Sequence, residues 1–567
     1  MTTTPHMFAA VPSGKPSLRA AYEAWLTAQS PQDDETTHGT AQRTSKPKSV
    51  GIVGGGMAGL YSALLLKSQG IDCHIFEAHP SRLGGRVYTH RFNNEPNQYF
   101  EAGAMRLPHT SEQQPVFDLI DWLNERLPPA NTINCITYNL YDPKGNLAYV
   151  NGRRMADGQA MTVEYANQHP ARLEFPLLPE DRHKTASELL DEAIGPYLQL
   201  LQKDFEKGFR EIVKYDNYSF YTYLTEIAGW SMEKVNYVEV MSSATNQFQN
   251  SFTELVIESM DFSGADWKTI ADGMDRLPNG CADVLGRERI TMGAAVREIE
   301  NLPDGRVAIH HSASAAPAVF DKVIMALPPA ALRMIKTPQW SVTKMQGIRS
   351  LHFEPLYKIG MRFRTRFWEK VARPSLGGQS ISDLPMRWCV YPSYGMGTEG
   401  PGALLLYSWM TDAYNWLPKS QEDRVRIGLQ NLQELYGNEV DVREQFIEAF
   451  DVAWPTEWAT GDAMFFPGQF RRLFNVARHP EGNVYFAGEH LSVHHTWIVG
   501  ALDSALHACH QILHDPELEP LRPEQAESTP RHTYDYSQCA QAGVLPVPRS
   551  ESLPASEKMQ RPWGMGF

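Results

Sequence analysis

The pattern of hydrophobic and polar positions divides this chain into stretches of two kinds. Short apolar runs between glycine or polar residues are typical of buried strands, and they occur at residues 49–53, 72–76, 306–311, 322–326, 357–364 and 403–409. Apolar residues at helical spacing predict amphipathic helices at residues 185–209, 219–227 and 422–436. Residues 111–269 are predicted to be mainly helical. The mixture predicts an α/β fold (α and β elements mixed).

The two ends of the chain differ in composition from the rest. Residues 1–48 are polar and rich in Thr, Ser and Pro, with one short helical pattern at 20–27, and we interpret them as an N-terminal arm. Residues 516–567 hold eight prolines among Glu, Ser and Gln. That composition is typical of an extended or disordered tail.

Length and charge limit the classes of protein that need to be considered. At ~150 residues per domain, 567 residues predict two to four structural units. The net charge of −14 argues against nucleic acid or an anionic membrane as the main partner. Six scattered cysteines include no CxxC pair, which indicates a reducing compartment and no zinc module. With no secretory pattern before residue 47, the sequence predicts a soluble, cytoplasmic protein.

The strongest local signal is a glycine-rich turn directly after the first strand. Residues 54–59 (GGGMAG) precede a helical pattern at 60–67. A strand, a tight turn and a helix N-terminus together can hold a pyrophosphate, because glycine lets backbone N–H groups approach the phosphates. Glu77 follows the second strand, where a carboxylate can accept both hydrogen bonds of a ribose diol. The motif also explains the uncharged run 49–66, which otherwise reaches the lower length limit for a membrane span.

A second glycine-containing segment lies five residues after Glu77. In residues 82–89 (RLGGRVYT), Arg82 and Arg86 flank the pair Gly84 and Gly85. The guanidinium groups can reach phosphates while the glycine backbone follows the dinucleotide closely. This segment favours FAD over NAD as the nucleotide.

Together these segments resemble the opening of the flavin amine oxidase superfamily, which includes monoamine oxidases and L-amino acid oxidases. Further similar segments are residues 273–278 (GMDRLP), 321–329 (DKVIMALPP), 486–489 (FAGE) and 497–501 (WIVGA). The resemblance implies FAD as cofactor, bound noncovalently because no cysteine stands beside Trp497. It implies that FAD contacts Gly54, Gly56, Met57, Ala58, Gly59, Glu77, Ala78, Arg82, Gly84, Gly85, Arg86, Met105, Arg106, Val296, Gly488, Glu489, Trp497 and Ile498.

The resemblance also implies a domain organisation. A Rossmann-like FAD-binding domain is expected from three separate segments, 49–110, 270–345 and 464–515. Inserted between them are the mainly helical segment 111–269, expected beside the substrate, and a substrate-binding domain with a mixed sheet, 346–463. Two interleaved domains and two tails are therefore expected.

Residues 101–108 (EAGAMRLP) are similar to the L-amino acid oxidase version of the segment that passes the flavin. In that family the arginine at the place of Arg106 pairs with the substrate carboxylate, a task that suits the planar guanidinium fork better than lysine. Tyr391, in residues 388–392 (WCVYP), is expected from the resemblance to donate its hydroxyl to the same carboxylate.

Three more residues take expected roles from the resemblance. Lys358, in residues 356–360 (LYKIG), matches the lysine that holds a water near flavin N5 and assists reoxidation. Trp497 is expected to form one wall of the substrate cage. The family usually has glycine or alanine before that tryptophan, whereas this chain has Thr496, which is expected to narrow the pocket.

The reaction implied is oxidative deamination of an L-amino acid, with hydride passing from Cα to flavin N5. The products are a 2-oxo acid, ammonia and, after reoxidation by O2, H2O2. One alternative is an L-amino acid 2-monooxygenase, which forms an amide. A second alternative, of another class, is a noncatalytic FAD-binding regulatory protein. A homo-oligomer, dimer or tetramer, is expected.

Two questions stay open in the sequence. His490, His494 and His495 have a spacing that could ligate zinc on a helix, but no acidic partner is evident, so no metal site is predicted. The preferred substrate side chain is also undecided. The acidic residues of the helical segment favour a basic side chain, and the aromatic residues at 215–223 favour a large apolar one; the acidic residues are Asp216, Glu226, Glu254, Glu258 and Asp261.

Overall fold

The computed structural model describes residues 46–110, 112–244, 246–262, 266–457, 459–514, 518, 520 and 521. Almost all of the expected N-terminal arm, with its helical pattern at 20–27, and of the Pro-rich tail lies outside these residues. Within the described part of the chain, no helix has the length and hydropathy needed to cross a membrane.

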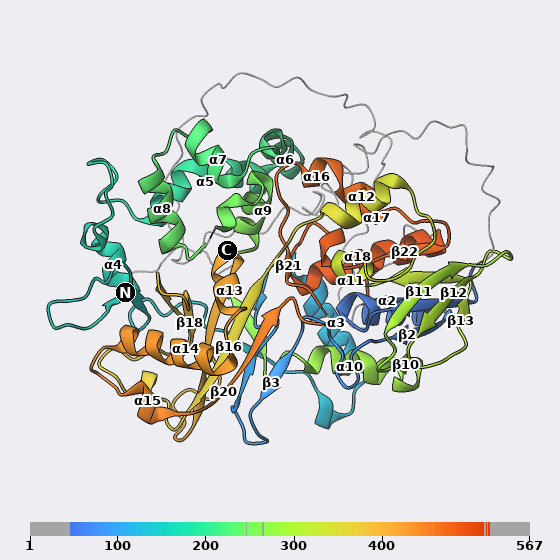
Figure 1. The fold of residues 1–567 in the computed structure, drawn as a ribbon, viewed down its shortest axis with the longest axis horizontal. Coiled ribbons are helices and arrows are strands. Elements are labelled where there is room, and N and C mark those ends of the chain that lie inside the picture. The colour runs from blue at the N-terminus through green and yellow to red at the C-terminus, as the bar shows by residue number, and fades with distance from the viewer. Residues whose placement is uncertain are drawn as a thin grey trace, which may run out of the picture.

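A five-stranded parallel sheet forms the first part of the fold. Its strand order is β10-β2-β1-β14-β22, with bounds β1 Ser49–Val53, β2 Asp72–Phe76, β10 Ile290–Thr291, β14 Lys322–Met325 and β22 Val484–Phe486. The helix α2 (Met57–Ser68) connects β1 to β2, and α18 (Ile498–Leu513) packs against α2 (Figure 1). β1 is buried from Val50 onward, because α2 lies on one side of it and Ile309 and Phe320 lie against Gly51 on the other; this explains its uninterrupted apolar sequence.

A seven-stranded mixed sheet forms the second part. Its order is β20-β16-β19-β18-β17-β7-β8, and the pair β17–β7 is parallel while the others are antiparallel. The bounds are β7 Leu147–Tyr149, β8 Met161–Thr162, β16 Leu356–Phe363, β17 Gln379–Ser382, β18 Trp388–Val390, β19 Gly402–Trp409 and β20 Phe446–Trp454. The apolar side of α14 (Gln421–Tyr436) packs on this sheet, where Gly428 lets the helix approach Met361 and Leu406 closely.

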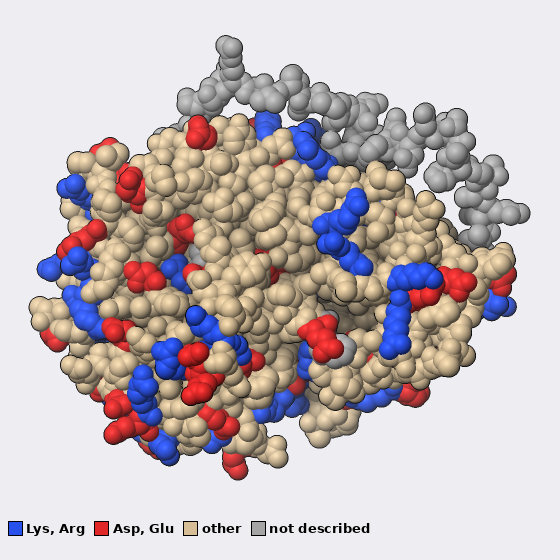
Figure 2. Space-filling model, viewed as in Figure 1, with Lys and Arg blue, Asp and Glu red and all other residues tan. Residues whose placement is uncertain are grey.

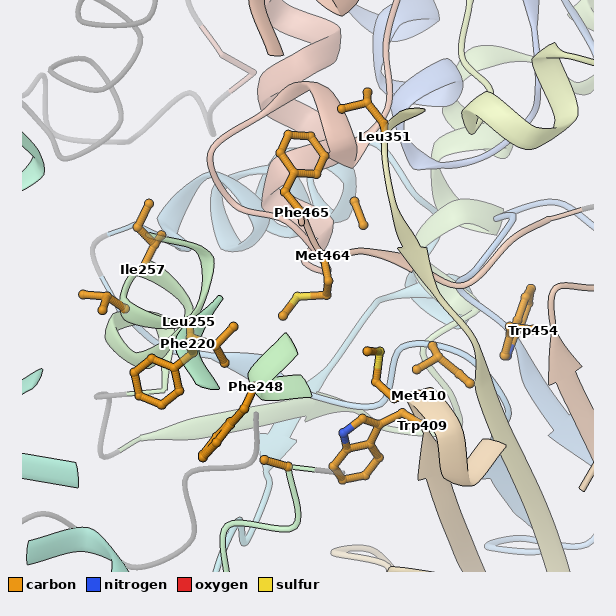
Figure 3. Close-up of a cluster of buried hydrophobic side chains, with 14 of the residues drawn as sticks. Phe220, Phe248, Leu255, Ile257, Leu351, Trp409, Met410, Trp454, Met464 and Phe465 are labelled. Carbon is orange, nitrogen blue, oxygen red and sulfur yellow. The ribbon is translucent and has the colours of Figure 1, made fainter. Parts of the chain in front are cut away.

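A group of helices from the segment 112–262 lies above the mixed sheet (Figure 1). They are α5 Ala186–Lys203, α6 Phe205–Ile212, α7 Phe220–Thr222, α8 Met232–Met241 and α9 Phe252–Asp261. Two further helices of the segment lie elsewhere: α3 Gln114–Asn124 packs against α18, and α4 Val163–Gln168 follows β8 at the edge of the mixed sheet. A capping box between Thr185 and Glu188 starts α5. Phe220, Phe248 and Leu255 from this group belong to one buried cluster with Trp409 and Met410, which joins the helices to the end of β19 (Figure 3).

The same segment also contributes strands, which its helical periodicity did not predict. The strands β7 and β8 belong to the mixed sheet, and β6 (Cys135–Thr137) pairs with β9 (Trp267–Ile270). Strands of two to four residues are too short to show a period-two pattern. Their place was decided by pairing with distant strands.

The remaining elements are short, and three of them, β11, β12 and β13, form an antiparallel sheet that packs on β1 through β13. The strands are β3 Thr89–Arg91, β4 Tyr99–Glu101, β5 Leu107–Pro108, β11 Val296–Asn301, β12 Val307–His311, β13 Ala318–Phe320, β15 Phe353–Glu354 and β21 Asp462–Ala463. The helices are α10 Arg276–Leu285, α11 Pro329–Leu332, α12 Val342–Ser350, α13 Met410–Trp416, α15 Val442–Gln445, α16 Gln469–Arg472 and α17 Phe474–Arg478. On the face shown in Figure 2, acidic and basic side chains are interspersed.

Candidate active site

A cavity of about 1600 Å³, part of it open to solvent, lies between the parallel sheet and the mixed sheet. Its lining combines the turn after β1 with residues of α9, β16, β19 and the start of α18. This volume includes space that is open to solvent. The cavity brings the glycine-rich turn and the strands of the mixed sheet together at one site.

The turn after β1 has a backbone that only glycines can form. Gly54 has a φ of +105°, and a Cβ on Gly59 would lie 2.0 Å from the Gly54 carbonyl oxygen. A Cβ on Gly56 would meet nothing within 4 Å, and Gly56 lines the cavity. Close packing beneath the turn and open space above it are the conditions that a pyrophosphate at a helix N-terminus requires.

Glu77 lies at the end of β2, beside this turn. Its Oε2 accepts a hydrogen bond of 2.6 Å from the Gly55 N–H, and its Oε1 accepts one of 2.7 Å from the His79 N–H. Burial raises the pKa of Glu77, and these backbone hydrogen bonds and Arg82 oppose that shift. The two hydrogen bonds fix the carboxylate at the cavity wall.

The two arginines of the segment 82–89 hold the backbone around the cavity. Arg82 donates to the Gly85 carbonyl at 2.7 Å, and its guanidinium lies 4.5 Å from the Tyr88 ring centroid. Arg86 donates to Glu489 Oε1 at 2.7 Å and to the Gly461 carbonyl at 2.9 Å. Segments far apart in the sequence are therefore joined beside the cavity.

Glu489 connects three of these segments. Besides the ion pair with Arg86, it accepts hydrogen bonds from the backbone N–H of Ala463 at 3.2 Å and of Thr496 at 2.9 Å. Burial by itself raises the pKa of Glu489, but Arg86 and neighbouring histidines outweigh burial and hold it below its ordinary value. The ionised carboxylate thus positions the turn before α18, and the N-terminus of α18 lines the cavity.

Arg106 lies between β4 and β5, and its side chain is only 8% exposed. Its guanidinium carbon is 5.1, 5.7 and 5.5 Å from the ring centroids of Phe262, Trp267 and Trp388. Arg106 Nη1 donates to Gln379 Oε1 at a long 3.5 Å. Among the described residues, no carboxylate forms an ion pair with it. A buried cation without a counter-ion faces the cavity.

Lys358 projects from β16 into the same cavity. Its Nζ donates to the Gly103 carbonyl at 2.6 Å and lies 4.5 Å from the Tyr407 ring centroid. Burial lowers the pKa of Lys358 to about 7; Asp462 and Glu101 oppose this shift, and Arg106 adds to it. The amine is therefore poised between its charged and neutral forms near neutral pH.

Most of the residues expected from the sequence meet at this cavity. Its lining includes Gly54, Gly56, Met57, Ala58, Glu77, Arg82, Gly84, Gly85, Arg86, Met105, Arg106, Lys358, Gly488, Glu489, Thr496, Trp497 and Ile498. Gly59, Ala78 and Val296 do not line it; Gly59 instead packs under the turn, and Val296 begins β11.

The structure does not bring Tyr391 to the cavity. Its hydroxyl forms hydrogen bonds of 2.8 Å with the Ser380 hydroxyl and 2.9 Å with the Tyr436 hydroxyl, in the core on the α14 side of the sheet. Tyr391 is therefore not placed to contact a substrate carboxylate in this cavity, contrary to the expectation from the sequence. Side chains alternate along a strand, and the tyrosine that lines the cavity is Tyr407, which is paired in register with Lys358.

Several cavity residues had no assigned role at the sequence level. Tyr407 lies in a segment that resembles amino acid oxidases. Its pairing in register with Lys358 on the neighbouring strand places it at the cavity. Glu354 and Asp462 meet only because β15 pairs with β21, a two-residue ladder with no local signal. Gln247 reaches the cavity from the helical segment, and so does Glu258, one of the acidic residues that favoured a basic substrate side chain in the sequence.

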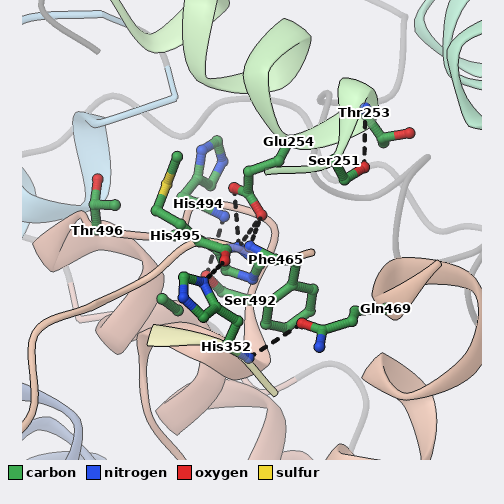
Figure 4. Close-up of polar contacts among 12 residues, drawn as sticks. Ser251, Thr253, Glu254, His352, Phe465, Gln469, Ser492, His494, His495 and Thr496 are labelled. Carbon is green, nitrogen blue, oxygen red and sulfur yellow. Dashed lines mark hydrogen bonds and ion pairs between the residues drawn. The ribbon is translucent and has the colours of Figure 1, made fainter. Parts of the chain in front are cut away.

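The three histidines before α18 do not form a metal site. His494 Nδ1 lies 3.3 Å from Asp261 Oδ1, and His495 Nδ1 lies 2.9 Å from Glu254 Oε2 (Figure 4). The acidic partners that the local sequence did not show come from α9. Within the described residues, no group of three or more His, Cys, Asp or Glu side chains is arranged to hold a metal ion.

Comparison with known proteins identifies the family. Residues 57–513 match the model of the flavin-containing amine oxidoreductases. The chain belongs to this family. FAD is therefore the cofactor of this flavin amine oxidoreductase, in agreement with the resemblance seen in the sequence.

Individual relatives are similar over most of the flavin amine oxidoreductase chain. It is 30% identical to a Bacillus subtilis strain 168 protein named for L-amino-acid oxidase activity (82% of this chain, 95% of that one). It is 28% identical to L-amino-acid oxidase 4 of Hebeloma cylindrosporum (82% of both chains). A Dictyostelium discoideum protein named for a bifunctional amine oxidase is 32% identical over 85% of this chain, which spans about half (48%) of that longer protein.

Solved structures show the same fold. Cyclohexylamine oxidase from Brevibacterium oxydans IH-35A superposes with a TM-score of 0.61 at 18% identity, covering 83% of this chain and all of that one. Putrescine oxidase bound to putrescine gives 0.61 at 19% identity, covering 82% and 99%.

The residues of the cavity fit FAD. The backbone at Gly54 and Gly84 has φ values of +105° and +98°, and Gly56 leaves open the space that a side chain would fill. Glu77 stands where a ribose diol can be bound, and the N-terminus of α18 lines the cavity. The described residues that line the cavity include no cysteine.

Proposed function

We propose that this flavin amine oxidoreductase oxidises L-amino acids to 2-oxo acids and releases ammonia and H2O2. The observation that carries the proposal is the buried Arg106 guanidinium in the cavity, which has no carboxylate partner among the described residues. The names of the relatives from Bacillus subtilis and Hebeloma cylindrosporum support it.

A buried charge is costly unless it is paired. The aromatic rings around Arg106 keep its guanidinium away from water, and its hydrogen bond to Gln379 is long. A substrate carboxylate would compensate this cation through two parallel hydrogen bonds. An amine without a carboxylate would leave it unpaired, so Arg106 favours an amino acid over a simple amine.

The other residues would bind and orient the two reactants. Gly54, Gly56, Glu77, Arg82 and Glu489 would hold FAD, which supplies the two-electron acceptor between the amine and O2. The proposed binding is noncovalent.

Arg106 would hold the carboxylate so that the Cα–H bond points at the acceptor, and Trp497 would form one wall beside it. The Cα–H bond breaks with its electron pair, and one proton leaves the amine. The imino acid then takes up water to give the 2-oxo acid and ammonia, while O2 takes two electrons and two protons and leaves as H2O2.

A peroxide assay with the L- and D-amino acids and their decarboxylated amines tests the proposal. We expect H2O2 from L-amino acids only, together with one 2-oxo acid and one ammonia per peroxide. An amide product would replace this proposal by a 2-monooxygenase, and turnover of the amines alone would replace it by an amine oxidase. Absence of flavin bleaching with every substrate under anaerobic conditions would rule out all three activities and leave a noncatalytic flavoprotein.

A further inference from the structure

Part of the cavity wall is acidic. Glu258 of α9, Glu354 of β15 and Asp462 of β21 all line the cavity, and Glu354 is paired in register with Asp462. Glu258 and Glu354 are buried. Burial, together with the other nearby carboxylates, raises the pKa of both Glu258 and Glu354 well above the ordinary value. Each carboxylate disfavours the ionisation of its neighbour, because like charges repel.

Three carboxylates follow one face of α9, and the protein supplies a counter-ion to two of them. Glu254 accepts hydrogen bonds from His495 Nδ1 at 2.9 Å and from the Phe465 N–H at 2.7 Å (Figure 4). Asp261 forms an ion pair with His494. Glu258 lies between them in the sequence and, unlike them, lines the cavity.

Two polar atoms at this wall lack partners among the described residues: Glu258 Oε2 and Gln247 Oε1 are buried and have no hydrogen-bond partner there. Gln247 Nε2 donates to the two oxygens of Glu354 at the long distances of 3.4 and 3.5 Å. Hydrogen bonds from Gln247 and Asn250 oppose the rise in the pKa of Glu354 that burial causes. Asp462 differs. Burial and Glu489 raise its pKa to about 6, and Arg86 and Lys358 oppose that rise. Unpaired buried acceptors that line a cavity are compensated when a ligand brings donors.

We propose that Glu258 and Glu354 bind the cationic end, guanidinium or ammonium, of the substrate's side chain, with Gln247 Oε1 as a further acceptor. The inference rests on the proposed function, in which Arg106 holds the carboxylate of the same molecule. The acidic wall and Arg106 both lie near Tyr407. Burial, Asp462, Glu354 and Glu258 raise the pKa of Tyr407, and Arg106 opposes that rise. One extended amino acid would therefore pair both of its charged ends.

The energetics favour a cation over other side chains. An apolar side chain would bury the acceptors of Glu258 and Gln247 without hydrogen bonds and would bind more weakly for that reason. A neutral amide or urea could share hydrogen bonds with these carboxyls, but only a cation gains from their ionisation, because its positive charge opposes the burial and like-charge repulsion that raise their pKa. Sites built to bind a polar group reject analogues that lack it by up to ~10⁵-fold.

Steady-state peroxide kinetics on the FAD-loaded enzyme test this inference. The substrates are L-arginine and L-lysine, the neutral urea analogue L-citrulline, and the apolar L-norleucine and L-phenylalanine. We expect kcat/KM for arginine or lysine to exceed that of citrulline and norleucine by at least about 100-fold. The relative values for arginine and lysine distinguish a guanidinium from an ammonium ligand.

Two near-isosteric variants locate the effect. In Glu258→Gln and Glu354→Gln, we expect kcat/KM for the cationic substrate to fall at least about tenfold, mainly through KM, with citrulline and phenylalanine unchanged or improved. Glu226→Gln is the matched control, because Glu226 is exposed and outside the cavity lining. The thermal-midpoint shift caused by arginine under anaerobic conditions gives a second readout, expected to shrink in Glu258→Gln but not in Glu226→Gln.

Each outcome is decisive. Preference for neutral substrates, or an equal loss for all substrates in both variants, overturns the inference while the proposed function stands. Absence of oxidation of any L-amino acid overturns the proposed function and this inference with it. If Glu258→Gln does not fold, the substrate series on the unmodified enzyme and Glu354→Gln still decide the question.

Discussion

The ammonium of Lys358 lies 4.5 Å from the centroid of the Tyr407 ring, its register partner on the neighbouring strand, and donates to the Gly103 carbonyl. The amine thereby connects the mixed sheet to the segment that leads to Arg106. Because burial lowers its pKa to about 7, a change of pH near neutrality changes the charge of the cavity.

Replacing Lys358 by Met should slow reoxidation of the enzyme by O2 about 100- to 1,000-fold, because a positive charge near the reacting oxygen is lost. The protonated amine predominates below pH 7, so the wild-type reoxidation rate should fall as the pH rises through about 7. The variant should be slow at every pH. Stopped-flow mixing of the anaerobically reduced enzyme with oxygenated buffer measures both effects. Equal rates for the two proteins across this pH range would contradict the role.

Replacing Arg106 by Gln should lower kcat/KM for L-amino acids by about 30- to 5,000-fold, since removing one partner of a buried charge pair costs about 2–5 kcal/mol. Lysine should rescue little of this loss, because it lacks the planar fork. The FAD content and the thermal midpoint of Arg106→Gln are the controls, and neither should fall. A loss of both would place Arg106 in the structure rather than at the carboxylate.

Thr496 adopts a φ of +70°, a conformation that costs a β-branched residue on the order of 1–3 kcal/mol. Thr496→Gly should relieve this strain, offset in part by the entropy of glycine. We expect a net gain in the free energy of unfolding of about 1 kcal/mol and a wider cavity. Urea unfolding of the FAD-loaded protein measures it. Thr496→Ala, which keeps a side chain at positive φ, should recover less than glycine does, and a less stable Gly variant would contradict the strain.

Burial alone lowers the pKa of His494, but Asp261, Asp503 and Glu112 outweigh burial and raise it to about 9. A group whose pKa is raised by folding contributes its full stabilisation below its pKa in the unfolded state, about 6.5 for histidine. This contribution is lost as the pH rises through about 9. The contribution is on the order of 3 kcal/mol. Thermal midpoints between pH 6 and 10 should fall less steeply in His494→Gln than in the wild type; parallel curves would show that the ion pair does not contribute.

Noncovalent FAD should leave the protein on denaturation. Precipitation with acid is expected to give a yellow supernatant and a colourless pellet, because the described residues lining the cavity include no cysteine to form a thioether link. Flavin absorbance that stays with the washed pellet would instead establish a covalent link.

Most of the residues expected to bind the nucleotide could be placed at the cavity from the sequence, because each is positioned by its immediate neighbours. The strand β1, the turn at residues 54–59 and the helix α2 follow one another without a break, and the conformation at Gly54 depends on local backbone geometry. Glu77 and the segment 82–89 follow within thirty residues of that turn. Contiguous motifs of this kind carry their own geometry.

The substrate part of the cavity was harder to predict, because its residues meet through pairing and packing. Tyr391 and Tyr407 both lie on or beside strands of the mixed sheet, and only the observed side-chain alternation shows that Tyr407 reaches the cavity. Glu354 and Asp462 are over a hundred residues apart and meet through one two-residue ladder.

The sequence by itself therefore determined the cofactor, the family and the mixed α/β class, since these depend on short motifs and on the alternation of strands and helices. Only the tertiary structure decided which charged side chains have a partner of opposite charge. Glu254 and Asp261 are paired with histidines, whereas Glu258 and Arg106 have no counter-ion among the described residues. Whether a buried charge has a partner depends on contacts between distant segments, and the proposed recognition of the substrate rests on that property.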